Sequence, residues 1–216
     1  MRIAVIGATG MAGRAIYREA LTRGEEAVAI VRDGAKAREL FGADAEVLEQ
    51  DAFDLSAHDL RGFDAVVNAF AIAPDEAHRH IDLARHLVAV APSSEEGSPR
   101  LLFILGAGSL TNPATGELAV EDIRRVPGSE AWINIPTQQL KELEYLRTVE
   151  DANWVGVSPQ LQFTAGDATT PQLGDEELLT ATDGKSHTTA GTMAVAVLDE
   201  LQHPAHHNTR FTVSDA

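Results

Sequence analysis

Three glycines, Gly7, Gly10 and Gly13, follow directly after the first apolar segment of the chain, residues 3–6. Residues 11–23 then carry small and apolar side chains at the spacing of one helix face. A buried strand that passes through a glycine turn into a helix is typical of a site for a dinucleotide pyrophosphate, because the start of the helix offers free N–H groups to an anion. The alternative is a strand-to-helix turn in which the glycines serve packing alone.

Each glycine has a separate expected task in such a turn. Gly7 permits the tight turn, Gly10 lets the phosphates approach the backbone, and Gly13 lets the helix pack closely against the strand. The spacing is G-x-x-G-x-x-G, so the flanking strand and helix, rather than the glycines alone, favour a nucleotide site. The expected contacts at the phosphates are Gly7, Thr9, Gly10, Met11, Ala12 and Gly13.

The rest of the chain alternates between apolar strands and helical segments. Strands are expected at residues 2–6, 27–31, 46–51, 64–70, 101–105, 154–157 and 209–213. Helices or helical turns are expected at residues 11–23, 35–41, 54–60, 74–91, 137–151 and 191–201. This alternation predicts an α/β fold with a Rossmann-type, doubly wound parallel sheet, in which ligands lie at the carboxyl ends of the strands.

The second half of the chain is expected to supply the cover of the site. Segment 111–136 holds several prolines and glycines, so it is expected to be irregular and to lie over the site. Residues 178–182 and 185–188 flank the dipeptide Asp183-Gly184, which predicts a hairpin. The whole chain is expected to be a single domain, with residues 160–216 as a small C-terminal extension at the substrate site.

Composition and charge restrict the kind of protein. At 216 residues the chain has room for one full core, and no apolar run approaches the length of a bilayer span. It contains no cysteine, which rules out disulfides and thiolate chemistry and agrees with a cytoplasmic protein. We expect a monomer or a homodimer. The net charge of −16 disfavours nucleic acid as a partner, because such a surface repels phosphate backbones. No metal site is expected, because metal-binding spacing is absent from the histidines at positions 78, 80, 86, 203, 206 and 207.

The ends of the second and third strands indicate which dinucleotide is bound. Arg32 ends the second strand about 20 residues after the glycines, where an arginine pairs with a 2′-phosphate and indicates NADP(H). Asp33 follows at once, so NAD(H) remains an alternative, as does a surface arginine paired with Asp33. Asp51 and Ala52 follow the third strand, where a carboxylate accepts from the adenine amine; a plain helix N-cap at Asp54 is the alternative.

The ends of the fourth and fifth strands are expected near the nicotinamide. Ala69 and Ala71 leave room for the cofactor, while Phe70 forms either a wall or part of the core. Gly108 and Ser109 lie in the turn after the fifth strand, so Gly108 is an expected cofactor contact. Ser109 is the best-placed hydroxyl and therefore the candidate catalytic residue, a tight turn alone being the alternative.

The tyrosine–lysine pair of ordinary short-chain reductases is absent. That pair has the order Tyr-x-x-x-Lys, whereas Tyr145 is followed four positions later by Val149 and is preceded by Lys141. Tyr145 is therefore expected to pack along a helix rather than to act as an acid.

Seven stretches of the chain occur in an order that resembles one known family. They are Ile-Gly-Ala-Thr-Gly-x-x-Gly at 6–13, Ala-Ile-Val-Arg at 29–32, Asp-Ala-Val-Val-Asn-Ala-Phe at 64–70, Gly-Ala-Gly-Ser-Leu at 106–110, Val-Ser-Pro at 157–159, Asp-Gly-Lys-Ser at 183–186 and Arg-Phe-Thr-Val at 210–213. Together they resemble the atypical short-chain dehydrogenase/reductase group of NADH-flavin reductases, which is similar to biliverdin IXβ/flavin reductases and NmrA-like regulators. The resemblance covers essentially the whole chain.

The resemblance implies a function as well as a fold. It implies NAD(P)H binding along residues 7–13 and at Arg32, and a flavin or similar flat acceptor near Ser109 with substrate contacts at Pro159, Gln160 and Phe163. Gln160 stands where related members commonly carry alanine. The implied activity is hydride transfer from NADPH to a flavin that is a substrate rather than a tightly bound cofactor. The alternatives are a non-catalytic NADP(H) sensor and, less favoured, a sugar epimerase or dehydratase.

Overall fold

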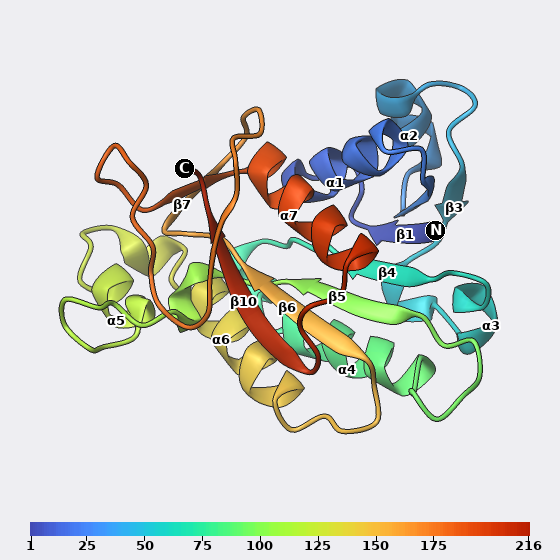
Figure 1. Cartoon of the computed structure of the whole chain (residues 1–216). Helices are drawn as coiled ribbons and strands as arrows, with labels where there is room; N and C mark the ends of the chain where they lie inside the picture. Colours follow the sequence, from blue (N-terminus) through green and yellow to red (C-terminus); the bar gives the residue numbers. More distant parts are fainter.

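Eight strands form the main sheet of the computed structural model, which describes residues 1–216 (Figure 1). In spatial order they are β3 (Val47–Glu49), β2 (Glu26–Val31), β1 (Arg2–Ile6), β4 (Ala65–Asn68), β5 (Arg100–Ile104), β6 (Trp154–Ser158), β10 (Thr209–Ser214) and β8 (Gln172–Gly174). Every neighbouring pair is parallel except β10 and β8. The direction in which strands are added reverses between β1 and β4, so the predicted doubly wound Rossmann-type sheet is confirmed.

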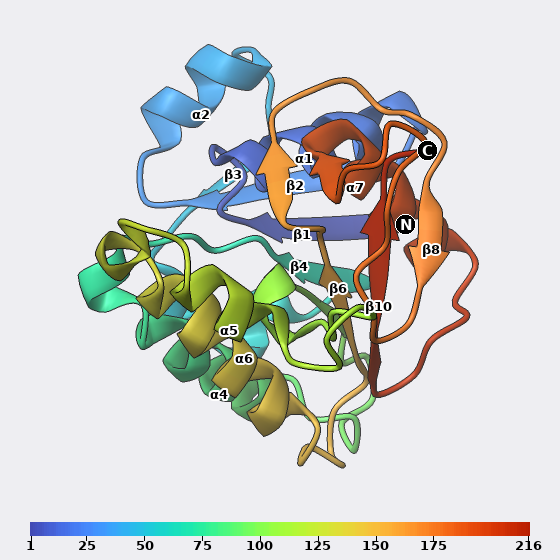
Figure 2. The same cartoon turned by 90° about the vertical axis from the view of Figure 1, so that its left-hand side faces the viewer.

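Helices cover both faces of this sheet (Figure 2). One face is covered by α1 (Met11–Thr22), α2 (Gly34–Phe41) and α7 (Ala190–Gln202), and the other by α3 (Ala57–Leu60), α4 (Arg79–Val90) and α6 (Asn134–Leu146). Along β1, Ile3 and Val5 join the first core cluster while Ala4 and Ile6 join the second, because successive strand side chains point to opposite faces. None of the helices combines the length and apolar character needed to cross a membrane.

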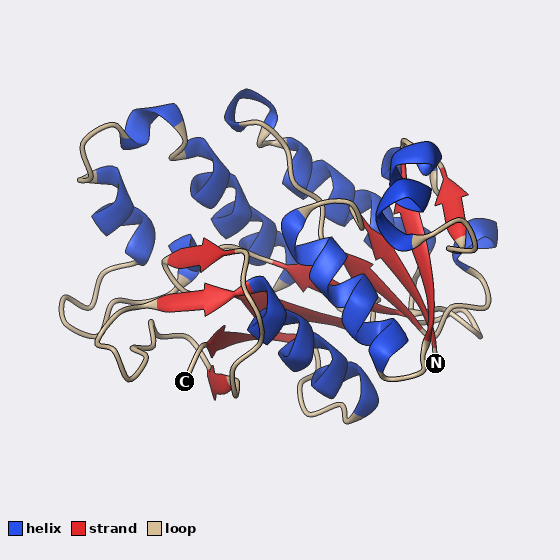
Figure 3. Cartoon of the chain, turned by 90° about the horizontal axis from the view of Figure 1, so that it is seen from above, coloured by secondary structure: helices blue, strands red, loops and turns tan.

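Shorter elements gather at the carboxyl ends of the parallel strands, on the left of Figure 1. They include α5 (Ala119–Arg124) and the strand β7 (Gln162–Thr164), which pairs in parallel with β9 (His187–Thr189) outside the main sheet. In Figure 3 the helices are blue and the strands red, and the central strands run between helices on either side. This end of the sheet therefore carries the loops that a ligand at the switch point would meet.

The predicted hairpin about Asp183-Gly184 is wrong in its strands. A turn is present, since Gly184 has φ +81° and Ala181 N–H donates to Lys185 O at 2.8 Å. Residues 178–182 form no strand, because the backbone N–H of Leu179 donates to the side chain of Gln160 instead. The following strand, β9, finds its partner in β7, so a tertiary pairing replaces the local one.

Several predicted helix boundaries also differ. Segment 111–136 is not irregular throughout, because it contains α5 and the start of α6, with Pro136 in the first turn of α6, where its missing N–H costs nothing. The helix predicted from residue 74 begins instead with a separate 3-10 turn, Pro74–Glu76, and α4 follows from Arg79. β8 was not expected from the sequence at all.

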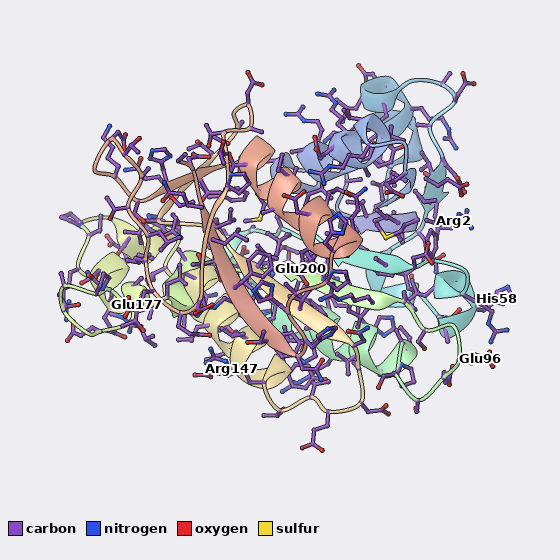
Figure 4. All side chains as sticks on the ribbon, viewed as in Figure 1. Arg2, His58, Glu96, Arg147, Glu177 and Glu200 are labelled. Atoms are coloured by element: carbon purple, nitrogen blue, oxygen red, sulfur yellow. The ribbon has the colours of Figure 1, made fainter.

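A buried ion pair fixes the end of α7 to the sheet. Glu200, labelled in Figure 4, lies on α7 and accepts from Arg100 Nη2 at 2.6 Å. His206 Nδ1 lies 2.7 Å from the other carboxylate oxygen of Glu200. Burial alone would raise the pKa of Glu200, but the hydrogen bonds from His206 and Arg100 outweigh it, so the pKa is lowered. This network holds the segment between α7 and β10, which allows β10 to extend the sheet beyond β6.

Candidate functional site

The glycine turn between β1 and α1 is built by close backbone approach. Gly7 has φ +72°, and a Cβ at this position would lie 2.6 Å from the carbonyl oxygen of Ala69 at the end of β4. A Cβ at Gly13 would lie 2.3 Å from the carbonyl oxygen of Gly7. No side chain caps α1, whose N-cap is Gly10, so the N–H groups of its first turn have no partner within the helix. The turn therefore presents free donors at the carboxyl edge of the sheet, as an anion site requires.

A first cavity of about 290 Å³ opens beside this turn, toward β2 and β3. Its lining carries three basic side chains, Arg32, Lys36 and Arg79. Arg32 is exposed and forms no ion pair, because the neighbouring carboxylate of Asp33 caps α2 and accepts from the Lys36 backbone N–H at 2.9 Å. Neither Arg32 nor Lys36 therefore forms an ion pair with a carboxylate of the chain. The alternative interpretation, in which Arg32 is a surface arginine paired with Asp33, is not what the structure shows.

The opposite wall of the first cavity comes from the end of β3. Asp51 and Ala52 line it, as expected, and the Asp51 carboxylate accepts from the Phe53 backbone N–H at 3.1 Å. Asp51, not Asp54, therefore caps the turn that follows β3, because Asp54 is the last residue of the 3-10 turn Ala52–Asp54. Arg79 lies over the ring of Phe53 at 4.4 Å from its centroid, which fixes the arginine at the cavity edge.

A second cavity of about 430 Å³ lies on the other side of the turn, toward β5 and β6. Four residues line both cavities and join them into one groove: Gly10, Ala69, Phe70 and Ala71. The second cavity is lined mainly by apolar side chains, and no aspartate, glutamate, lysine or arginine contributes to it. The two halves of the groove thus differ in character, one basic and the other uncharged.

Most of the residues expected at the site line this groove. Gly7, Thr9, Gly10, Arg32, Asp51 and Ala52 line the first cavity, and Met11, Ala12, Gly108, Pro159, Gln160 and Phe163 line the second. Phe70 lines both cavities and also packs edge-on against Phe53 and His80, so it is at once wall and core. Gly13 and Ser109 line neither cavity. Gly13 lies beneath the turn, where it permits the close approach described above.

Ser109 is turned away from the groove. It is buried in a 3-10 turn, and its hydroxyl lies 3.4 Å from the carbonyl oxygen of Gly106 and 3.4 Å from Arg210 Nη1. Arg210 also donates to Ser158 Oγ at 3.2 Å and pairs with Glu176. The hydroxyl of Ser109 therefore belongs to a polar cluster below the turn rather than to the cavity wall.

Gln160 lines the second cavity, but its side-chain amide is already fully engaged. Its Nε2 donates to Thr212 Oγ1 at 2.7 Å, and its Oε1 accepts from Leu179 N at 2.8 Å and from Ser186 Oγ at 3.0 Å. A buried amide needs such partners on both atoms. Gln160 thus holds the loop after β6 against β10 and the 179–186 segment, which explains why a glutamine is accommodated here.

Several lining residues were not expected from the sequence. In the first cavity they are Gln50, Lys36 and Arg79, and in the second they include His80, Ile123, Trp132, Gln139 and Leu161. His80 is buried and packs against Phe70, with ring centroids 5.4 Å apart. Tyr145, by contrast, lines neither cavity; it lies on α6 under the guanidinium of Arg85 of α4, away from the groove.

Comparison with known proteins agrees with this geometry. Residues 7–204, which include the glycine turn and every cavity-lining residue except Ile6, match a family described as NAD(P)H-binding. The chain belongs to the NAD(P)H-binding family. It is 38% identical over 215 residues to the uncharacterized protein YwnB of Bacillus subtilis, covering 99% of this chain and 98% of YwnB.

Two solved structures are similar over the full length of this family member. A Lactobacillus casei protein is 38% identical with a TM-score of 0.91, covering 100% of both chains. A Streptococcus pneumoniae protein, which its name proposes as an NADH-flavin reductase, is 32% identical with a TM-score of 0.87, again covering 100% of both chains. The suspected relationship to the NADH-flavin reductase group is therefore supported by the fold and by sequence identity together.

The residues of the glycine turn fit the dinucleotide of the NAD(P)H-binding family. No side chain lies near the position that a Cβ at Gly10 would occupy, because such a Cβ would meet only the carbonyl oxygen of Gly7, at 3.2 Å. The uncapped start of α1 leaves N–H donors for two phosphates, and basic side chains are confined to one half of the groove.

Proposed function

We propose that this member of the NAD(P)H-binding family is a reductase that uses NADPH to reduce a flat, uncharged aromatic acceptor, of which a flavin ring is the test case. The observation that carries the proposal is the division of one groove into a basic half and an apolar half on either side of a phosphate-binding turn. The name of the Streptococcus pneumoniae relative agrees with this class of reaction. Bound NADPH would supply the hydride, and the protein would supply orientation and exclusion of water.

The proposed orientation follows from the charges. The adenosine half belongs in the first cavity, where Arg32 and Lys36 are free to pair with a 2′-phosphate. The nicotinamide half then belongs in the second cavity beside Ala69, Ala71 and Gly108, whose own side chains are no larger than a methyl group. NADPH is therefore the proposed cofactor in preference to NADH.

The acceptor would occupy the apolar space left over the nicotinamide. Trp132 and Leu161 line this space and are both more than 40% exposed, which suits contact with a flat ring that enters from solvent. Phe163 and Pro159 close the side nearest β6. Ser109 has no part in this proposal, because its hydroxyl is held by Arg210 below the turn.

The absence of charged side chains from the second cavity leads to a prediction about the acceptor. Riboflavin is expected to be reduced with a higher kcat/KM than FMN, by roughly 10-fold, because a phosphate brought into this cavity would lose water without gaining a cation. The net charge of −16 acts in the same direction by repelling anionic acceptors. Steady-state oxidation of NADPH with each acceptor, at matched ionic strength, measures the ratio.

The same assay has an outcome that would contradict the proposed acceptor class. If FMN is reduced several times better than riboflavin, the acceptor is recognised through its phosphate, and the uncharged cavity does not receive the whole ring system. Repeating the assay at high salt separates local from long-range charge effects, since only repulsion by the overall net charge is screened.

A further inference from the structure

A glutamate and a histidine without other polar partners lie together behind the second cavity. Glu142 on α6 is 1% exposed, and its Oε2 has no hydrogen-bond partner. His80 on α4 is 3% exposed and lines the cavity. His80 Nδ1 lies 3.8 Å from Glu142 Oε2. Buried carboxyl groups without partners are rare in folded proteins, so this one calls for a physical reason.

Packing does not explain the glutamate. Glu142 has the apolar Leu143 as its neighbour on the buried face of α6, and Leu146 lies one turn further on. A leucine at position 142 would bury its side chain there without the cost of desolvating a carboxyl group. The only ionisable side chain within ion-pair distance of Glu142 is His80. Glu142 thus stands behind His80, which in turn separates it from the cavity.

The protonation state of the pair follows from its burial. Burial raises the pKa of Glu142 well above its ordinary value and lowers the pKa of His80 to about 4. Burial thus favours the uncharged form of each group, a carboxylic acid beside a neutral imidazole. No other charged group contributes to either shift; Arg79, next to His80 on α4, is directed to Phe53 and Glu76.

The distance between the two groups is compatible with proton transfer after a small adjustment. At 3.8 Å the atoms are about 0.6–1 Å beyond a normal hydrogen bond. A rotation of the Glu142 carboxyl group that brought Oε2 within hydrogen-bond distance would give this unpartnered atom a partner. The Glu142 O–H would then donate to His80 Nδ1, which would fix the tautomer of His80 with its proton on Nε2.

The second cavity has no other acid. Among its lining residues His80 is the only one that titrates, since the remaining polar side chains are Trp132, Gln139 and Gln160. Tyr145 and Ser109 lie outside it. An acceptor that takes up a hydride there and completes its reduction at a nitrogen or oxygen atom also needs one proton.

We propose that His80 donates this proton to the acceptor and that Glu142, which lies behind it, replaces the proton on His80. The proposal rests on the proposed reductase function. The His80 Nε2–H bond breaks as an N–H or O–H bond forms on the acceptor, and the Glu142 O–H bond breaks as an N–H bond forms at His80 Nδ1. The electron pair arrives with the hydride from NADPH, which becomes NADP⁺. Glu142 is left as a carboxylate and His80 with its proton on Nδ1. After the product leaves, His80 Nε2 takes up a proton from solvent in the cavity and the Nδ1 proton returns to Glu142, which restores the starting state. His80 is thus the catalytic residue and Glu142 a positioning residue that supplies the proton.

Glu142→Gln tests the proposal, because it preserves the shape of the side chain and removes its acidic proton. The variant is expected to lower kcat with riboflavin by roughly 100-fold while the Kd for NADPH stays within about two-fold. His80→Gln is expected to cause a similar loss, and the double variant is expected to be no worse than either single one, because the two residues act as a unit. Glu144→Gln, an exposed change on the same helix, is the matched control and should leave kcat unaltered.

The pH profile separates a chemical role from a structural one. The wild-type kcat is expected to fall as pH rises through the raised pKa of Glu142, since the carboxylate has no proton to pass to His80. Glu142→Gln should lack this fall. Equal pH profiles for the two proteins, or a kcat for Glu142→Gln within two-fold of wild type, would overturn the proposal.

Two spectroscopic measurements test the pair in the wild-type protein without turnover. The infrared difference between wild type and Glu142→Gln at pH 7 should contain the carbonyl band of a protonated carboxylic acid, and the ring ¹⁵N signals of His80 should show a neutral imidazole protonated at Nε2. An ionised Glu142 or a charged His80 at that pH would overturn the proposal even if the variants fold poorly. The spectra can be as expected while wild type fails to oxidise NADPH with every acceptor tested. In that case the reductase function fails instead, and with it the use assigned to the pair.

Discussion

Replacing Gly13 by alanine is expected to lower the free energy of unfolding by about 3 kcal/mol and to weaken NADPH binding by roughly 100-fold or more. The added Cβ would lie 2.3 Å from the carbonyl oxygen of Gly7, 2.8 Å from its carbonyl carbon and 2.9 Å from Ala8 Cα. All three atoms are backbone, so no side-chain rotation relieves the overlap. The turn itself must move, and the N–H groups at the start of α1 lose their alignment toward the phosphates.

Urea unfolding and calorimetric titration with NADPH measure these two effects. Gly10→Ala is the matched control for stability, because its Cβ would meet only the carbonyl oxygen of Gly7 at 3.2 Å. That variant is expected to change the free energy of unfolding by about 1 kcal/mol or less. If Gly13→Ala binds NADPH as tightly as wild type, the turn does not hold the phosphates, and the glycines serve packing alone.

Replacing Arg32 by alanine is expected to weaken NADPH binding by roughly 10- to 100-fold while NADH binding changes by less than about three-fold. The reason is that the guanidinium of Arg32 lines the first cavity and forms no ion pair within the chain, so its charge is available to a 2′-phosphate. Lys36→Ala is expected to act in the same direction with a smaller effect, since a lysine ammonium does not bind a phosphate in a bidentate manner.

Calorimetry with NADPH and NADH, on the same preparations, gives both affinities. Arg38→Ala is the matched control: it removes a cation six residues further along the chain, on α2, but Arg38 does not line the cavity. Losses of equal size for the two cofactors would remove Arg32 from the 2′-phosphate site. A loss in Arg38→Ala as large as in Arg32→Ala would assign the effect to overall charge.

The parts of the fold that were predicted correctly are those in which a local pattern has one solution. The apolar runs at 2–6 and 101–105 are strands because they are covered on both faces, and the glycine turn has the geometry that its spacing indicates. The hairpin prediction failed for a different reason. Asp183-Gly184 does form a turn, but Gln160 lies 19 residues before Leu179 and captures the backbone N–H that a hairpin would have used.

The sequence predicted where in the fold the candidate site lies, but it did not predict which way the side chains at the site point. Ser109 and Gly108 are neighbours in one 3-10 turn, yet Gly108 lines the cavity while the hydroxyl of Ser109 contacts Arg210, over 100 residues away in the chain. No local pattern reveals which way such a turn faces. His80 was considered only as a metal ligand, because its neighbour Glu142 comes from another helix.

One signal for the buried pair was present in the sequence. Gln139, Glu142, Leu143 and Leu146 are spaced as one face of a helix, so a carboxyl group is placed among residues of an apolar stripe. A charged residue on such a stripe usually indicates either a solvated edge or a buried group with a function. Only the packing of α4 against α6 decides between them, because it buries Glu142 completely and places His80 beside it.

Anaerobic stopped-flow mixing of the protein with NADPH and riboflavin tests the central claim most directly. The account predicts that nicotinamide absorbance decreases and reduced flavin appears in equal amounts, at a rate that saturates with riboflavin and far exceeds the rate without protein. Tight binding of NADPH with no oxidation by riboflavin, FMN or FAD would contradict a flavin-reducing activity and favour an NADP(H) sensor.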